Sequence, residues 1–271
     1  MPQPVTSAMK RAPSMVVMIL AAGLAPACSS GAAGKVNYAV TAQQNYERGV
    51  KEMKEEDWIA AAKYFSFIKA RFPYSKYAVL AELRLADAEF GAEHYLQAID
   101  AFKQFVKFHP SHEMVRNGYA SFRIAGAYYE MLPGDLWILP PSFEKDQSGT
   151  SDAHRELTEF MKKYPTSPQI KKARALLARI NLRLAEHEMY VAKFYWSRGQ
   201  PMGTVLRLRR LLDKHGGVGY DPEALYLLGK AYVEIKEPRR AREAWERLVK
   251  QYPKDGHADD ARDQLRKLPT G

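Results

Sequence analysis

Apolar and polar positions repeat along the chain with a spacing that can be counted from Tyr46 onward. An alanine is followed by apolar residues four and seven positions later and by a proline twelve positions later. Four stretches follow this pattern: Ala61, Phe65, Ile68 and Pro73; Ala98, Phe102, Phe105 and Pro110; Ala153, Leu157, Phe160 and Pro165; and Ala241, Trp245, Leu248 and Pro253. Residues four and seven apart share one face of an α-helix, so each stretch predicts a helix with one apolar face.

A small residue stands twelve positions before the alanine in three of the four copies, at Gly49, Ala86 and Gly229. This residue belongs to a preceding helix, and we expect the two small residues to let the helices cross closely while the large apolar residue fills the gap. Proline then ends the second helix. Ser75 and Ser167 follow two of these prolines and are placed to cap the next helix.

This pattern is similar to the tetratricopeptide repeat. It predicts an all-α fold, a right-handed α-solenoid of about five tetratricopeptide-type helix pairs. We expect the N-terminal repeats 1–3 over residues 45–168, and a long helix with repeats 4–5 over residues 169–271.

The third copy contains an insertion. Its small residue, Gly126, precedes Ala153 by 27 residues instead of twelve. The inserted loop at 132–148 is rich in proline and glycine and carries Trp137, Ile138 and Leu139. Long loops in compact domains often have a function. The sequence leaves two interpretations open, a loop that binds a partner or an excursion that folds back on the repeats.

Residues 169–198 contain neither glycine nor proline, and their apolar residues recur at spacings of three and four. We expect one long helix of about 45 Å, from a rise of 1.5 Å per residue, that bridges the N-terminal and C-terminal repeats. A partner helix is expected over residues 202–215. This fourth pair lacks the alanine and the proline of the pattern.

The first 27 residues read as a signal peptide, because Lys10 and Arg11 precede an apolar run that is too short to span a bilayer. Cys28, the single cysteine, follows in a segment similar to a lipobox, although Leu24 lies one position too far from it and Pro26 is unusual there. We expect lipid on Cys28 and a flexible tether over 28–44. The competing interpretation is a stray thiol after an ordinary signal peptide.

The net charge of +10 falls to about +8 when the signal peptide is removed. Such a surplus could attract nucleic acid, a membrane surface or an acidic protein, or it could be carried by solvated helix faces. Export makes nucleic acid the least suitable of these partners.

The chain shows no pattern of catalysis, and we expect no enzyme, cofactor or metal. There is no HExxH sequence, and adjacent helical residues such as Glu186, His187 and Glu188 point in different directions and cannot converge on one ion. The glycines at 216–219 follow a helix and lack the lysine of a phosphate loop. An enzyme that acts on cell-wall sugars would need paired carboxylates, for which the sequence gives no sign.

Binding surfaces are therefore the expected functional features, as in other helical solenoids. The run from Arg71 through Phe72 and Tyr74 to Tyr77 places aromatic residues outside the repeat positions. Arg207, Arg209 and Arg210 form a dense basic cluster in the fourth pair.

Several sequence features together are similar to the BamD family of lipoproteins in the outer-membrane β-barrel assembly machinery. They are the lipobox-like segment, the five repeats, the long fourth-pair helix and the run Tyr195-x-x-Arg198-Gly199 followed by Arg207. The runs Arg-Phe-Pro-Tyr-Ser and Lys-Tyr-Pro-Thr-Ser also match. Two departures are Phe72, where relatives often carry tyrosine, and the longer loop at 132–148.

The resemblance implies an outer-membrane location on the periplasmic side, with a palmitate-type lipid anchor. It implies that the N-terminal repeats bind unfolded outer-membrane proteins near Arg71, Phe72, Tyr74 and Tyr77. It also implies that the C-terminal half contacts the barrel-forming subunit through Tyr195, Arg198 and Arg207, beside the accessory lipoproteins. From this we expect Arg207→Glu to weaken the contact without unfolding the chain.

The main alternative is another periplasmic tetratricopeptide scaffold, such as a Tol-Pal-associated cell-division coordinator. Those proteins usually carry an N-terminal coiled coil, and no heptad stretch precedes Tyr46.

Overall fold

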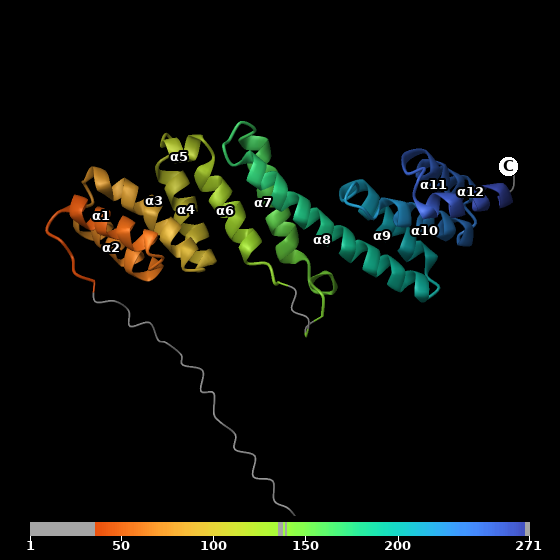
Figure 1. Cartoon of the computed structure of the whole chain (residues 1–271), viewed down its shortest axis with the longest axis horizontal. Coiled ribbons are helices and arrows are strands. Elements are labelled where there is room, and N and C mark those ends of the chain that lie inside the picture. Colours follow the sequence, from red (N-terminus) through yellow and green to blue (C-terminus); the bar gives the residue numbers. More distant parts are fainter. Residues whose placement is uncertain (1–35, 135–137, 139, 269–271) are drawn as a thin grey trace, which may run out of the picture. The chain divides into compact units, whose positions relative to one another are not determined.

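The structure is a computed structural model that describes residues 36–134, 138 and 140–268. Over these residues it is all-α and contains no strand (Figure 1). The helices are α1 (Ala42–Lys54), α2 (Trp58–Arg71), α3 (Lys76–Gly91), α4 (Tyr95–Phe108), α5 (Glu113–Arg116), α6 (Tyr119–Glu130), α7 (Ser148–Lys163), α8 (Ile170–Ser197), α9 (Pro201–Lys214), α10 (Asp221–Glu234), α11 (Pro238–Gln251) and α12 (Gly256–Lys267), with a short 3-10 helix η1 (Ser142–Glu144) before α7.

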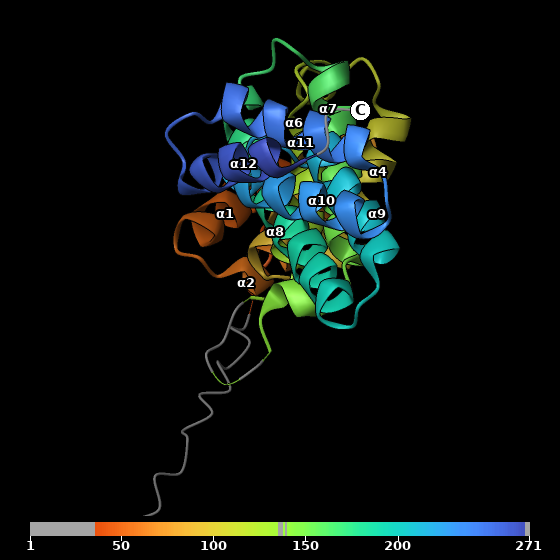
Figure 2. The same cartoon turned by 90° about the vertical axis from the view of Figure 1, so that its right-hand side faces the viewer.

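The helices pack in antiparallel pairs with their neighbours in the chain, α1 with α2, α3 with α4, α6 with α7, α8 with α9 and α10 with α11 (Figures 1 and 2). Helix α12 packs against α10 and α11 after the fifth pair. The expected all-α tetratricopeptide architecture is confirmed.

The repeat pattern marks close helix crossings. A Cβ atom at Gly49 of α1 would lie 2.7 Å from the Phe65 ring of α2, and one at Gly229 of α10 would lie 2.2 Å from Nε1 of Trp245. Phe65 and Trp245 are almost fully buried. These two glycines are therefore required by space, because any side chain there would overlap an aromatic ring.

The third pair departs from the expectation at Gly126. A Cβ atom there would meet only the Phe90 ring, at 3.8 Å, an ordinary contact with α3. Ala125, one residue earlier, is the fully buried small residue that packs in the same cluster as Ala153 and Leu157. Assigning Gly126 to this crossing was wrong, because the insertion had removed the fixed spacing that identified the small residue elsewhere.

The fourth pair is more regular than its sequence suggests. Thr204 occupies the alanine position, and Leu208 and Leu211 follow four and seven residues later; all three are fully buried. Twelve residues before Thr204 lies the buried Ala192 of α8, whose carbonyl oxygen accepts a hydrogen bond from the Thr204 hydroxyl at 3.3 Å. Threonine is tolerated because its hydroxyl is satisfied within the crossing.

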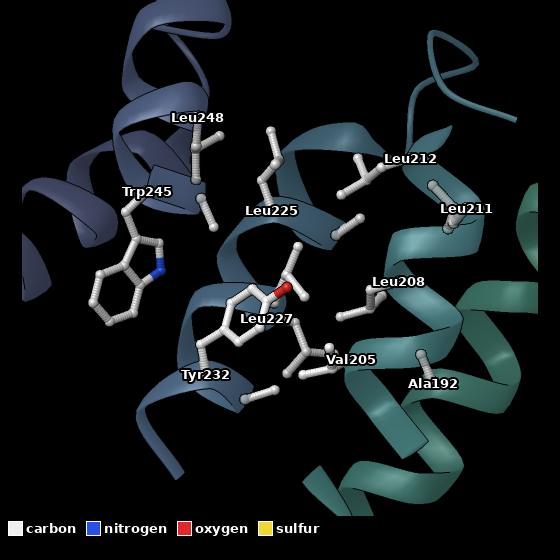
Figure 3. Close-up of a cluster of buried hydrophobic side chains, with 14 of the residues drawn as sticks. Ala192, Val205, Leu208, Leu211, Leu212, Leu225, Leu227, Tyr232, Trp245 and Leu248 are labelled. Atoms are coloured by element: carbon white, nitrogen blue, oxygen red, sulfur yellow. The ribbon is translucent and has the colours of Figure 1, made fainter. Parts of the chain in front are cut away.

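The long helix predicted over 169–198 is confirmed as α8, whose 28 residues rise about 42 Å. Its first half packs in one core cluster through Ala173, Ile180 and Leu184. Its second half packs in another through Ala185, Met189 and Ala192. Figure 3 shows this second cluster, in which side chains of α9, α10 and α11 converge, among them Leu208, Leu225, Tyr232 and Leu248.

The described parts of the 132–148 loop fold back on α8. Arg183 donates a hydrogen bond to the carbonyl oxygen of Pro133 at 2.9 Å, and Nδ1 of His187 donates one to the carbonyl oxygen of Phe143 at 2.6 Å. The Phe143 ring also packs against Tyr190. Of the three apolar residues singled out in the loop, Ile138 is exposed, while Trp137 and Leu139 lie outside the described residues.

The packed chain begins before α1. Tyr38 stacks on Phe67 of α2 at 4.0 Å between ring centroids, and the side chain of buried Asn45 holds both backbone groups of Ala39. Residues 38–44, which we expected to belong to a flexible tether, therefore include packed and helical positions. The signal peptide and Cys28 lie outside the described residues.

Within residues 36–134, 138 and 140–268, the structure has no helix that is both long and apolar enough to cross a membrane.

Candidate protein-binding surfaces

The four residues expected to bind substrate lie at the turn between α2 and α3, and the structure divides them. Phe72 and Tyr77 pack against the core of the first pair, where the Tyr77 ring lies 5.5 Å from that of Tyr46. Arg71, the last residue of α2, is exposed, and Tyr74 is fully exposed, at 102%. Arg71 and Tyr74 are therefore the two members of the set that present their side chains to a partner.

The turn has a defined shape that fixes where Tyr74 projects. The Phe72 amide closes α2 on the carbonyl oxygen of Ile68, and the Ser75 hydroxyl accepts a hydrogen bond from the Tyr77 amide at 3.2 Å. Ser75 is thus the N-cap of α3, as the sequence predicted. A capped turn between two packed helices holds an exposed aromatic ring at low entropic cost.

Tyr195 and Arg198 lie at the C-terminal end of α8. The Tyr195 ring covers Gly203 of α9 so closely that a Cβ atom at Gly203 would lie 2.7 Å from it. Gly199 ends the helix with a φ of +65°, and the Gln200 amide bonds back to the carbonyl oxygen of Tyr195 at 3.0 Å. In the aromatic-x-x-Arg-Gly run, the tyrosine and the glycine therefore build the α8–α9 turn, as expected for a helix that ends on a left-handed residue.

Arg198 is the exposed member of that run. It lies at the C-cap of α8, where a cation is favoured by the helix dipole. Its guanidinium lies 5.3 Å from the centre of the Phe194 ring, which is itself half exposed. An arginine on an exposed aromatic ring is the kind of pair that is enriched in protein interfaces.

Arg207 lies in an ion-pair cluster around the buried Glu188, between α8 and α9. Its Nη1 is 3.3 Å from Oε2 of Glu188 on α8, and Nε of Arg210 is 3.0 Å from Oε1 of the same carboxylate. The Glu188 side chain is only 4% exposed, whereas that of Arg207 is 32% exposed. Arg207 therefore neutralises a buried charge, so we expect its reversal to lower the stability of the fold in addition to any effect on a partner contact.

His215 lies beside this cluster, at the end of α9. It is buried, its Nδ1 is 3.3 Å from Oδ1 of Asn181, and its ring contacts His154 of α7. Burial lowers the pKa of His215 below its usual value, and the nearby His154, Arg210 and Lys214 lower it further, while Glu188 raises it. Burial thus disfavours the protonated form of His215, which lies where α7, α8 and α9 meet.

A second buried carboxylate, Asp87 of α3, fastens the second pair to the third. It accepts a hydrogen bond from the Tyr119 hydroxyl at 2.6 Å and lies 3.0 Å from Nη1 of Arg84 and 3.3 Å from Nε of Arg123. Burial and the Asp87 charge raise the pKa of Tyr119. Sequence reasoning missed this cluster because its members are far apart in the chain.

An apolar groove along α2 was also missed. It has a volume of about 490 Å³, and Tyr38, Trp58, Ile59 and Phe67 are among its lining residues. The sequence signal was present, since Trp58 and Ile59 open α2 on positions that the repeat does not use.

The described residues hold no group of three or more histidine, cysteine, aspartate or glutamate side chains that could bind a metal ion. Glu186, His187 and Glu188 point to three different partners, Tyr220, Phe143 and Arg207, as expected for adjacent helical residues.

A family of outer membrane lipoproteins, YfiO, matches residues 38–245, from the segment before α1 into α11. The chain belongs to the YfiO family. The outer membrane protein assembly factor BamD of Caulobacter vibrioides is 25% identical to this YfiO-family chain over 222 residues, which cover 80% of it and 70% of the relative. The BamD of Rickettsia prowazekii is 26% identical over 190 residues, which cover 70% and 72%. The BamD of Neisseria gonorrhoeae is 22% identical over 249 residues, which cover 88% and 91%.

Proposed function

We propose that this chain is an assembly factor for outer membrane proteins, attached to the outer membrane by lipid on Cys28. One observation carries the proposal: the YfiO match extends over four of the five helix pairs and into the fifth, and the relatives that share this length are named outer membrane protein assembly factors.

The N-terminal repeats bind unfolded outer membrane proteins at the α2–α3 turn. The exposed Tyr74 ring and the Arg71 guanidinium supply one apolar and one cationic contact on a capped turn. Phe72 and Tyr77 contribute indirectly, because they pack against the first core cluster and so hold the turn in place. A tyrosine and an arginine together suit an extended peptide with apolar side chains and acceptor groups.

The C-terminal half binds the barrel-forming subunit through the end of α8, next to the accessory lipoproteins of the same machinery. Arg198, stacked on Phe194, makes the direct contact. Tyr195 shapes the turn by filling the space above Gly203, and Arg207 keeps α9 in place through Glu188.

Co-purification of the full chain from outer membranes tests the proposal. We expect a large barrel protein to be recovered with the wild-type chain and to be reduced at least about tenfold with Arg198→Glu, since a buried or central charge contact at an interface is worth about 2 kcal/mol or more. Arg174→Glu is the matched control, because Arg174 is exposed on the first half of the same helix. Recovery of cell-division proteins with no barrel protein would favour the Tol-Pal alternative.

A further inference from the structure

The groove along α2 is apolar and open. Its walls include Tyr38, Trp58, Ile59, Ala62, Phe67 and Ala70. Ile59 is 53% exposed and Tyr38 is 43% exposed, although both are large apolar residues. Exposed apolar surface of this kind marks a place where another molecule binds.

Trp58 lines this groove and packs against α3. Its indole lies on Gly91 of α3, where a Cβ atom would be 2.4 Å from the ring. Because Gly91 has no side chain, the ring can pack closely on α3, and Trp58 also lines the groove. Trp58 is thus an aromatic residue at the groove that also packs against its own fold.

The charged residues at the groove are few. Lys63, one turn after Ile59 on α2, lines it, and Glu89 lines it from the end of α3 with His94 as its partner at 2.9 Å. Aromatic rings with a lysine beside them are typical of side chains at a membrane–water interface, where rings lie at headgroup level and lysine attracts anionic lipid.

The chain enters the described fold at this groove. Tyr38 forms part of the wall, and Val40, two residues later, is 89% exposed. Cys28 precedes Tyr38 by ten residues, which can span at most about 35 Å. If Cys28 carries lipid, this edge of the protein is therefore bound to stay near the bilayer, whereas no such limit holds for the later repeats.

We propose that the groove lined by Tyr38, Trp58 and Ile59 docks on the lipid surface of the outer membrane. This inference rests on the proposed lipid anchor. The anchor keeps the groove near the membrane, so that a surface contact too weak to act alone is populated through a high effective concentration. The contact would orient the first repeat with its α2 face on the membrane.

Tryptophan fluorescence in vesicles tests the inference. The lipidated full chain is bound to vesicles of phosphatidylethanolamine and phosphatidylglycerol, with or without bromine on the acyl chains. We expect bromine to quench part of the fluorescence, and Trp58→Phe to remove at least about half of that quenching. Trp196→Phe, on α8, is the control and should keep it.

A second pair of variants guards against a folding defect in Trp58→Phe. Ile59→Glu should reduce bromolipid quenching at least about twofold with unchanged circular dichroism. Leu206→Glu, at a similarly exposed aliphatic position on α9, should not reduce it.

Three results would overturn the inference. Flotation of the chain with vesicles but unchanged quenching in Trp58→Phe would reject the groove contact alone. Failure of the lipidated chain to float would reject the anchor as well, while the assembly role would still be judged by co-purification. A response of Trp58 to an apolar strand-forming peptide, or to a second copy of the chain, without a response to bromolipid would assign the groove to that ligand instead.

Discussion

The carboxylate of Glu188 on α8 lies 3.3 Å from the guanidinium of Arg207 on α9, and the glutamate is buried while the arginine is two-thirds buried. A buried charge that loses its partner destabilises the fold more than the pair stabilises it. Arg207 is thereby both a candidate contact for a partner subunit and a structural residue, and the two roles need separate tests.

We expect Arg207→Glu to lower the free energy of unfolding by about 2 kcal/mol, because it places a second carboxylate against Glu188. Chemical denaturation measures the effect. Arg209→Glu, an exposed change two residues away, should stay within about 0.5 kcal/mol. Equal stability of the two variants would show that the ion pair contributes nothing.

Alanine substitutions at Tyr74 and Tyr77 should have different effects, one on peptide binding and the other on the free energy of unfolding. Tyr74→Ala should weaken binding of an unfolded outer-membrane-protein peptide at least about fivefold, with the free energy of unfolding unchanged within about 0.5 kcal/mol. Tyr77→Ala should cost about 2 kcal/mol of stability, since its ring packs against Tyr46 and the first core cluster. Calorimetric titration and thermal unfolding measure the two quantities. Unchanged peptide binding in Tyr74→Ala would remove the turn from the substrate site.

Two glycines within helices should respond in opposite directions to alanine. Gly229→Ala should destabilise the protein by about 1–3 kcal/mol, because the new methyl group would overlap Trp245 and disturb the hydrogen bond from its Nε1 to the carbonyl oxygen of Tyr226. Gly126→Ala should stabilise it by up to about 1 kcal/mol through helix propensity, since the site has room. Destabilisation by Gly126→Ala would restore the original assignment of that glycine to a tight crossing.

His215 should make stability depend on pH. Its pKa is lowered in the folded protein by burial and by the neighbouring cations, so the unfolded chain binds the proton more readily. The free energy of unfolding should therefore fall as the pH drops below about 6.5, the pKa of an unperturbed histidine, and level off below the folded-state pKa. Denaturation of wild type and His215→Gln at a series of pH values measures this. The same slope in both would assign the dependence to other groups.

The repeat could be predicted from the sequence because close helix crossings require small residues at fixed separations. Gly49 and Gly229 are such residues, since a Cβ atom at either position would overlap an aromatic ring. The fourth pair was harder to see because Thr204 satisfies its hydroxyl locally and so replaces alanine without changing the crossing. Gly126 was misassigned because the inserted loop removed the separation on which the argument depended.

The candidate surfaces were predicted less well, for two physical reasons. Phe72, Tyr74 and Tyr77 are all aromatic, and only the geometry of the turn decides that the Tyr74 ring is exposed while the other two are partly buried against the core. The partner of Arg207 lies on another helix, and the sequence shows nothing to connect it to Glu188 rather than to solvent. The roles of Tyr195, Arg198 and Arg207 in a partner contact remain predictions.

Helix α8 determines how the C-terminal repeats are rotated, about the helix axis, relative to the N-terminal repeats. Its residues up to Leu184 face one core cluster, and those from Ala185 onward face the next. Each residue advances an α-helix by about 100°. Insertion or deletion of a single residue between Leu184 and Ala185 would therefore turn every later repeat, together with Arg198, away from its present direction, and would break contacts that cross this point, such as that of His187 with Phe143. The residue count of α8 must therefore stay constant if the two candidate surfaces, the α2–α3 turn and the end of α8, are to keep their relative direction.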